Sequence, residues 1–69
     1  MRKYGVVLEP TKTGYSAYVP DLPGCVAAGK DRRQALSLIK GAIRFHIEGM
    51  EEDGLAVPRP TSICEMVEV

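Results

Sequence analysis

The stretch that decides the fold runs from Asp31 to Gly54 and reads DRRQALSLIKGAIRFHIEGMEEDG. Asp31 is suited to the start of a helix, because its carboxylate can accept hydrogen bonds from the free N–H groups of the first turn. Gln34, three residues later, can complete a capping box. Gly54 is typical of the residue that follows a helix, and Pro58 comes soon after it. The sequence therefore predicts one long helix between these two signals.

One face of this helix carries an apolar stripe. Successive residues of a helix lie about 100° apart, and this spacing places five large apolar side chains on one side. They are Leu36, Ile39, Ile43, Ile47 and Met50, flanked by Ala35, Ala42 and His46. We expect this stripe to pack on a sheet.

The opposite face carries a second series, which we call the helix seam: Leu38, Gly41, Phe45 and Gly49. Its spacing of three, four and four residues is that of a helix–helix contact. A glycine inside a helix costs about 1 kcal/mol relative to alanine, and close approach of another helix is a reason to keep one. We expect the seam to contact a second copy or a different protein. The alternative is that Leu38 and Phe45 are ordinary exposed apolar residues.

The sequence around the helix predicts a small sheet. Alternating apolar residues predict strands over 3–9, 15–19 and 25–29, and a less regular pattern predicts a fourth over 62–69. The order βββαβ indicates an α+β fold, with a small, mostly antiparallel sheet and one long helix packed on one face. We expect a single domain over 1–69, and a core this small benefits from oligomerisation.

The two cysteines, Cys25 and Cys64, lack the spacing of a zinc site. We place them on opposite edge strands, too far apart for a disulfide, and expect two reduced, mostly buried thiols with no metal and no cofactor. The formal net charge is zero, so nothing global attracts the chain to nucleic acid or to an anionic membrane. Without a membrane-spanning apolar run or a signal-peptide pattern, we expect a cytoplasmic protein.

Two residues could carry acid–base chemistry, and each has a simpler interpretation. Asp21 lies in a turn motif made of Pro20, Asp21, Leu22, Pro23, Gly24 and Cys25. We interpret it as a turn-forming residue, since no second acid stands beside it in the sequence. His46 borders the core stripe, where histidine is more often structural than catalytic. With no nucleophile–base motif and no phosphate-binding loop, we expect no enzymatic activity.

Charged residues gather at both ends of the predicted helix. Lys30, Arg32 and Arg33 form a basic cluster at its start, a candidate contact for phosphate or for an acidic partner. An acidic group at its end consists of Glu48, Glu51, Glu52 and Asp53. We interpret it as a solvated helix end, and the alternative is that it receives a basic partner. The basic cluster has no interleaved aromatic residues, and the chain lacks the second helix of the common DNA-reading motifs. We therefore do not expect direct nucleic-acid binding.

A set of residues spread over nearly the whole chain resembles the HicB antitoxin domain. The set consists of Tyr4, Gly14 with Tyr15, the run from Val19 to Cys25, Gly29 and Ala35, in that order. The resemblance implies a partial ribonuclease-H-like fold without that enzyme's active site. It also implies binding of a small HicA-type toxin, an RNA-cleaving protein with a double-stranded-RNA-binding-domain fold.

The sequence departs from the family pattern in two places. Many members add a C-terminal DNA-binding domain, whereas this sequence ends after the fourth predicted strand, so we expect a stand-alone HicB-like domain. The helix start often seen in the family is acidic or threonine-rich, whereas here it reads Lys30-Asp31-Arg32-Arg33.

The hypothesis is a non-enzymatic protein-interaction domain of the HicB antitoxin type, a dimer or tetramer through the helix seam, which masks a HicA-type toxin. One alternative is an orphan homo-oligomeric domain without a toxin. Another is a nucleic-acid-binding or nuclease-like protein, suggested by the fold analogy alone, and the shortage of convergent acids argues against it.

Overall fold

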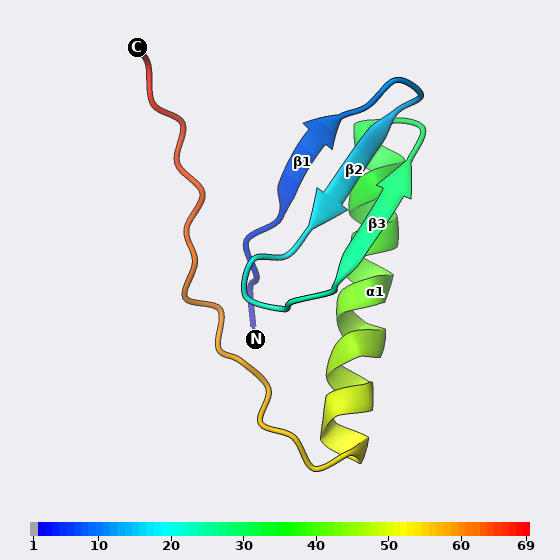
Figure 1. Ribbon diagram of the computed structural model, residues 1–69, viewed down its shortest axis with the longest axis vertical. Coiled ribbons are helices and arrows are strands. Elements are labelled where there is room, and N and C mark those ends of the chain that lie inside the picture. Colours follow the sequence, from blue (N-terminus) through cyan, green and yellow to red (C-terminus); the bar gives the residue numbers. More distant parts are fainter. Residues whose placement is uncertain (1) are drawn as a thin grey trace.

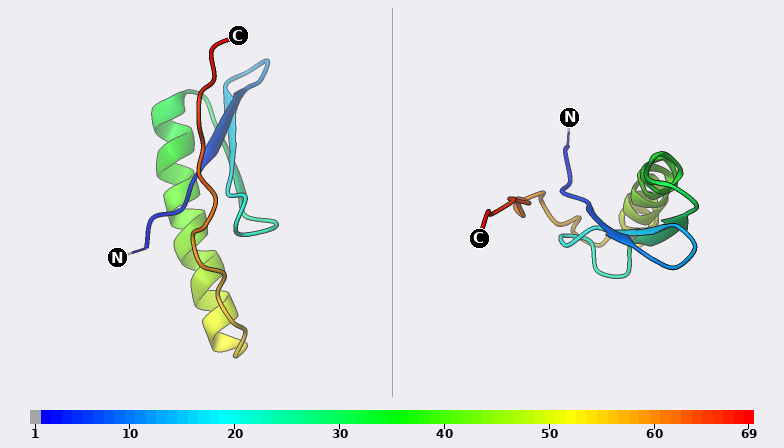
Figure 2. Two further views of the ribbon diagram at one scale, coloured as in Figure 1. Left: turned by 90° about the vertical axis from the view of Figure 1, so that its left-hand side faces the viewer. Right: turned by 90° about the horizontal axis from the view of Figure 1, so that it is seen from above.

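The computed structural model describes residues 2–69, and within them it contains three strands and one helix (Figure 1). The strands are β1 (Val7–Pro10), β2 (Tyr15–Tyr18) and β3 (Val26–Gly29), and the helix is α1 (Arg32–Glu52). The sheet order is β1-β2-β3, and both pairs of neighbours are antiparallel. The helix forms a second layer on one face of the sheet (Figure 2). This confirms the predicted α+β class.

Both ends of α1 have the cap structures that the sequence predicts. The carboxylate of Asp31 accepts a hydrogen bond from the backbone N–H of Gln34 at 2.8 Å. The Gln34 side chain accepts in return from the backbone N–H of Lys30 at 2.7 Å. At the other end, Gly54 has a φ of 70°, and the N–H of Leu55 donates to a carbonyl of the last helical turn at 2.9 Å. The hydrogen bonds at the two ends satisfy backbone groups that an uncapped helix leaves without partners.

The core is small and lies between α1 and the β2–β3 half of the sheet. Ala35 and Ile39 are its helical members, and Ile43 and Ile47 are partly buried against it. The prediction for Leu36 is wrong, because its side chain is 44% exposed. A sheet of three four-residue strands covers only a narrow strip of the helix, and Leu36 lies beside that strip. The fully buried set is Ala17, Val19, Leu22, Cys25, Ala35 and Ile39.

Gly29 explains how the helix approaches the sheet so closely. A Cβ atom at Gly29 would lie 2.5 Å from the backbone nitrogen of Ala35, in the first turn of α1. A Cβ atom at Gly14 would overlap the carbonyl oxygen of Gly29 on the neighbouring strand. The two glycines therefore let the β1–β2 hairpin, β3 and the start of α1 pack as one unit.

The predicted fourth strand over 62–69 is not formed, because this segment pairs with none of the three strands. After α1 the chain runs back along the β1 side of the sheet, and its last residues stand away from β1 (Figures 1 and 2). It does not make a crossover to a position beside β3. Cys64 is therefore exposed, contrary to expectation, whereas Cys25 is buried as expected, and both are free thiols.

Candidate interaction surfaces

The helix seam faces away from the sheet. Leu38 is 48% exposed and Phe45 is 80% exposed, so neither contributes to the core. A Cβ atom added at Gly41 or Gly49 would meet nothing within 4 Å. Packing within the protomer therefore gives no reason for these two glycines, in contrast to Gly29. The structure leaves the four seam residues along one open side of α1.

The basic cluster of Lys30, Arg32 and Arg33 lies exposed at the N-terminal end of α1. Among residues 2–69, the one ion pair joins Arg2 and Glu51 at 3.9 Å, so none of the three cations is held in a salt bridge. The cluster precedes the seam along the same helix.

Asp21 has a role that the sequence did not indicate. Its carboxylate accepts hydrogen bonds from the Ser62 hydroxyl at 2.8 Å, the Ser62 backbone N–H at 3.0 Å and the Thr61 hydroxyl at 3.3 Å. These donors lower the pKa of Asp21, with the Ser62 backbone N–H as the largest cause. Asp21 lies in the turn, and its carboxylate also holds a segment about forty residues away in the sequence.

The turn motif around Asp21 is rigid for a separate reason. The N–H of Val19 donates to the carbonyl of Cys25 at 3.2 Å, and this hydrogen bond closes the base of the turn motif. Leu22, at its centre, is completely buried, and Gly24 has a φ of 85°, which glycine adopts without strain. The motif therefore presents the Asp21 carboxylate from a fixed position.

A second anchor holds the same segment slightly earlier in the chain. The Tyr4 hydroxyl donates to the carbonyl of Pro58 at 2.6 Å. A Cβ atom at Gly5 would lie 3.2 Å from the carbonyl oxygen of Ser62, so the chain passes closely there. Beyond this point, residues 63–69, which we call the tail, make no hydrogen bond within the part of the chain that the structure describes.

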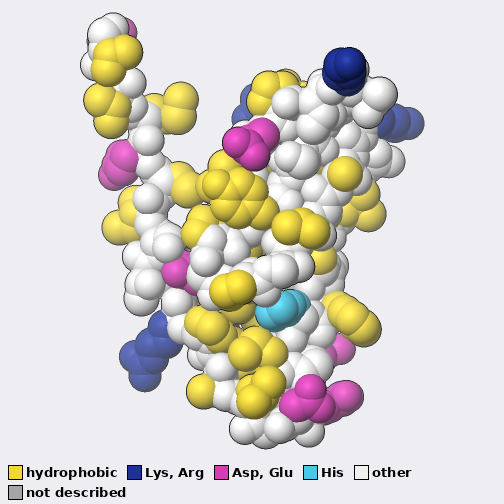
Figure 3. Space-filling view, viewed as in Figure 1, with side chains coloured by type: hydrophobic (Ala, Val, Ile, Leu, Met, Phe, Trp, Pro, Cys, Tyr) yellow, Lys and Arg dark blue, Asp and Glu magenta, His cyan; other side chains and the backbone are white. Residues whose placement is uncertain are grey.

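The tail carries much of the exposed apolar surface of the protomer. Ile63 is 81% exposed, Met66 is 98% exposed and Val67 is 79% exposed, and Val69 is fully exposed. In Figure 3 the tail stands apart from the body at the upper left, with its apolar side chains uncovered. An apolar segment of this kind marks an interaction site more often than an ordinary surface.

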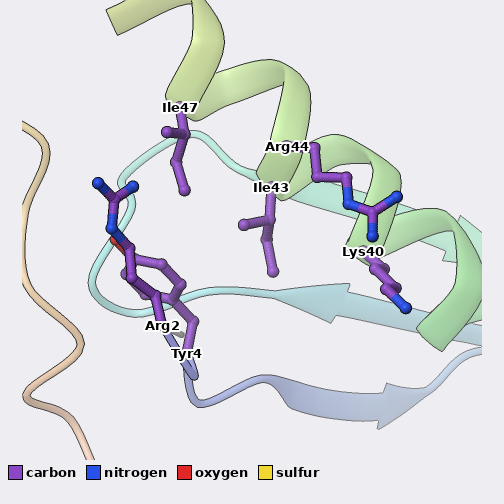
Figure 4. A pocket seen from close by; sticks show the side chains of 6 residues that line it. All are labelled: Arg2, Tyr4, Lys40, Ile43, Arg44 and Ile47. Atoms are coloured by element: carbon purple, nitrogen blue, oxygen red, sulfur yellow. The ribbon is translucent and has the colours of Figure 1, made fainter. Parts of the chain in front are cut away.

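A groove of about 370 Å³ lies between α1 and the segment that leads into β1. Tyr4, Ile43 and Ile47 give it an apolar floor, and all three are partly buried. Figure 4 shows Ile43 and Ile47 pointing from the helix toward Arg2 and Tyr4. We call this feature the cationic groove, because Arg2, Lys40 and Arg44 complete its lining. Lys40 and Arg44 are four residues apart, which is helical spacing, but no sequence pattern places Arg2 and Tyr4 beside them.

Neither a metal cluster nor a membrane span is found in the region from 2 to 69. No three His, Cys, Asp or Glu side chains there lie close enough together to hold a metal ion. In the same range no helix combines the length and the apolar character needed to cross a bilayer.

Burial raises the pKa of the Cys25 thiol, which favours its neutral form.

Comparison with known proteins gives one family and several relatives. A family described as "HicB_like antitoxin of bacterial toxin-antitoxin system" matches residues 4–69. An uncharacterized 14.9 kDa protein of Haemophilus phage HP1 is 43% identical over 64 residues, which are 93% of this chain and 48% of the phage protein. A UPF0150 protein of Helicobacter pylori is 39% identical over 91% of this chain and 89% of its own length.

A third relative comes from an archaeon. A UPF0150 protein of Thermoplasma acidophilum is 41% identical over 83% of this chain and 84% of its own length. The chain therefore spans about half of the phage relative and most of the two UPF0150 proteins.

Proposed function

Because its sequence matches the family over residues 4–69, the chain belongs to the HicB-like antitoxins, and we propose that it binds and masks a small RNA-cleaving toxin of the HicA type. The family match is the observation that carries this proposal. The role needs a protein-binding surface rather than a catalytic site, so we propose that the chain acts by binding and not as an enzyme.

The helix seam supports the binding role. Phe45 is 80% exposed to solvent, and Leu38 adds a second apolar contact about two helical turns away. Aromatic anchors of this kind dominate the binding energy of many interfaces. Gly41, between them, leaves room for another backbone to approach closely. We propose that the seam joins copies of the chain into a dimer or tetramer and that the toxin binds this assembly.

Charge complementarity indicates which end of α1 would contact the toxin. A protein that cleaves RNA needs a cationic surface for the phosphate backbone. The acidic group at the end of α1 is exposed at Glu48, Glu51 and Glu52 and is complementary to such a surface. Covering the toxin's cationic surface would exclude RNA by steric and electrostatic means. The basic cluster at the start of α1 would then remain outside this contact.

A second candidate is a homo-oligomeric domain without a toxin partner. The open seam favours it as well, because a self-complementary helix face is enough to explain Leu38, Phe45 and the two glycines. The two candidates agree on the seam and differ on what else the assembly binds.

Affinity capture separates them. The tagged chain is used to capture partners from extract of the cells that encode it, with mass spectrometry for identity and light scattering for mass. We expect a small RNA-cleaving protein in fixed proportion, and we expect the pair Leu38→Asp and Phe45→Asp to break the seam contact and so to lower the mass of the self-assembled chain. Ser37→Asp, at a neighbouring exposed position outside the seam, is the matched control. Recovery of the chain alone, as a defined oligomer, would favour the second candidate.

A further inference from the structure

Two features of the protomer are complementary and remain apart. The cationic groove has an apolar floor and three cations, and the tail is an apolar segment with two glutamates. Within residues 2–69 the tail makes no hydrogen bond or ion pair, and the polar groups of the groove make two contacts, the Tyr4–Pro58 hydrogen bond at 2.6 Å and the exposed Arg2–Glu51 pair at 3.9 Å. A surface ion pair of that kind is weak, so it does not close the groove.

The groove has the chemistry for an extended acidic segment. Lys40 and Arg44 are both exposed, and neither makes an ion pair with any residue of the described chain. They lie beside Ile43, which is only partly buried. Figure 4 shows Lys40 and Arg44 beside Ile43, with their charged ends on the side of Ile43 away from Arg2 and Tyr4. An occupant would gain both apolar contact and paired charge there.

Each face of the extended tail carries both apolar side chains and one carboxylate. In an extended segment, alternate side chains point to opposite sides. One side carries Glu65 with Ile63, Val67 and Val69, and the other carries Glu68 with Cys64 and Met66. Whichever side turns toward the groove, it brings apolar groups and one carboxylate.

The tail cannot reach the groove of its own protomer. Asp21 fixes the chain at Ser62, and the Tyr4 hydroxyl fixes it at Pro58. Tyr4 itself lines the groove, so the chain has already passed the groove before the tail begins. From Ser62 the tail runs on past β1 and away from the middle of α1, where the groove lies (Figure 1). Any segment that fills the groove must therefore come from outside the protomer.

We propose that the tail of one protomer occupies the cationic groove of a second copy and that the second copy does the same in return. Each protomer has one groove and one tail, so two copies close around a two-fold axis with the contact made twice. Seven extended residues span about 23 Å, whereas the helix from Lys40 to Ile47 rises by about 10 Å. The tail is long enough to cover the groove and still bridge the two protomers.

This contact is separate from the helix seam and does not rest on the toxin. If the seam also joins two copies, two different two-fold contacts whose axes cross at right angles build a tetramer. To isolate the tail contact, the test uses the full chain with Leu38→Ser and Phe45→Ser, which remove the seam's apolar groups without adding charge.

The test reverses charge on each side of the proposed contact. One variant carries Glu65→Lys and Glu68→Lys, and the other carries Lys40→Glu and Arg44→Glu. All four side chains are exposed, so the fold should survive, and circular dichroism checks this. We expect the seam-free parent to be a dimer by light scattering and each charge variant alone to be a monomer. In a 1:1 mixture, each tail meets a groove of opposite charge, and we expect a dimer containing one of each.

Three results would overturn the proposal. They are a monomeric seam-free parent, a dimer whose mass neither charge variant changes, and a mixture that forms no mixed dimer. A toxin lost from the Lys40→Glu, Arg44→Glu variant while the dimer persists would assign the groove to that partner instead. The native thiol gives an independent measurement, because Cys64 lies in the tail and is exposed whereas Cys25 is buried. A spin label on Cys64 of one copy should broaden the amide signals of Lys40 to Ile47 in an isotope-labelled second copy.

Discussion

The Asp21 carboxylate and Ser62 are joined by two hydrogen bonds, one from the Ser62 hydroxyl at 2.8 Å and one from its backbone N–H at 3.0 Å. The two residues are 41 positions apart in the chain. This contact ties the turn between β2 and β3 to the segment that follows α1, and it sets the direction in which the tail leaves the body.

The anchor at Asp21 should depend on pH. Its folded-state pKa is lowered by the Ser62 donors, so its contribution to stability is present above the unfolded pKa of about 3.8 and is lost as the pH falls through the folded-state pKa. Hydrogen exchange at the Ser62 amide should therefore report release of the segment in acid, below about pH 4.

Asp21→Asn should release the same segment at neutral pH, because it replaces one carboxylate oxygen with an N–H donor that cannot accept from Ser62. We expect Ser62 exchange to rise by about tenfold. Glu9→Gln, at an exposed carboxylate on β1, is the control and should leave that rate unchanged. Equal rates in the Asp21→Asn and parent proteins would contradict the anchor.

The core should depend on Ile39 far more than on its neighbour Leu38. Ile39 is 1% exposed, so Ile39→Ala should lower the free energy of unfolding by about 2–5 kcal/mol through lost burial and a cavity. Leu38→Ala should change it by no more than about 0.5 kcal/mol when measured in a monomeric background. Urea unfolding followed by circular dichroism gives both values, and similar losses in the two variants would place Leu38 in the core.

Substitution of the glycines by alanine should have opposite effects on stability at Gly29 and Gly41. Gly29→Ala drives a Cβ atom to 2.5 Å from the Ala35 backbone, so we expect a loss of about 1–3 kcal/mol from overpacking. Gly41→Ala meets open space and should stabilise the isolated protomer by about 1 kcal/mol through helix propensity. If the seam brings two helices together, the same change should weaken self-association. A Gly41→Ala protein that is both more stable and equally associated would mean that the seam does not need this glycine.

The helix and its caps were predictable because their signals are local. Asp31 and Gln34 lie three residues apart, and Gly54 marks the stop by its own backbone freedom. Leu36 was misplaced because helical periodicity gives the direction of a side chain but not the width of the sheet beneath it. Only the structure shows that the sheet stops short of Leu36.

The Asp21 anchor and the tail could not be predicted for a different reason. The partners of Asp21 are hydroxyl and amide groups far along the chain, and nothing in Pro20-Asp21-Leu22 indicates them. The tail has the composition of a strand, but a strand also needs a neighbour, and the protomer does not supply one for residues 62–69. The cationic groove likewise depends on Arg2 and Tyr4 lying against α1, which helical spacing alone does not reveal.

The most direct test of the antitoxin account is inhibition of RNA cleavage. A purified HicA-type toxin encoded by the same genome is mixed with a labelled RNA, and the chain is added in increasing amounts. We predict that cleavage stops at a fixed ratio of chain to toxin and that both proteins leave a sizing column together. Unchanged cleavage in the presence of excess folded chain, with the two proteins eluting apart, would contradict the account.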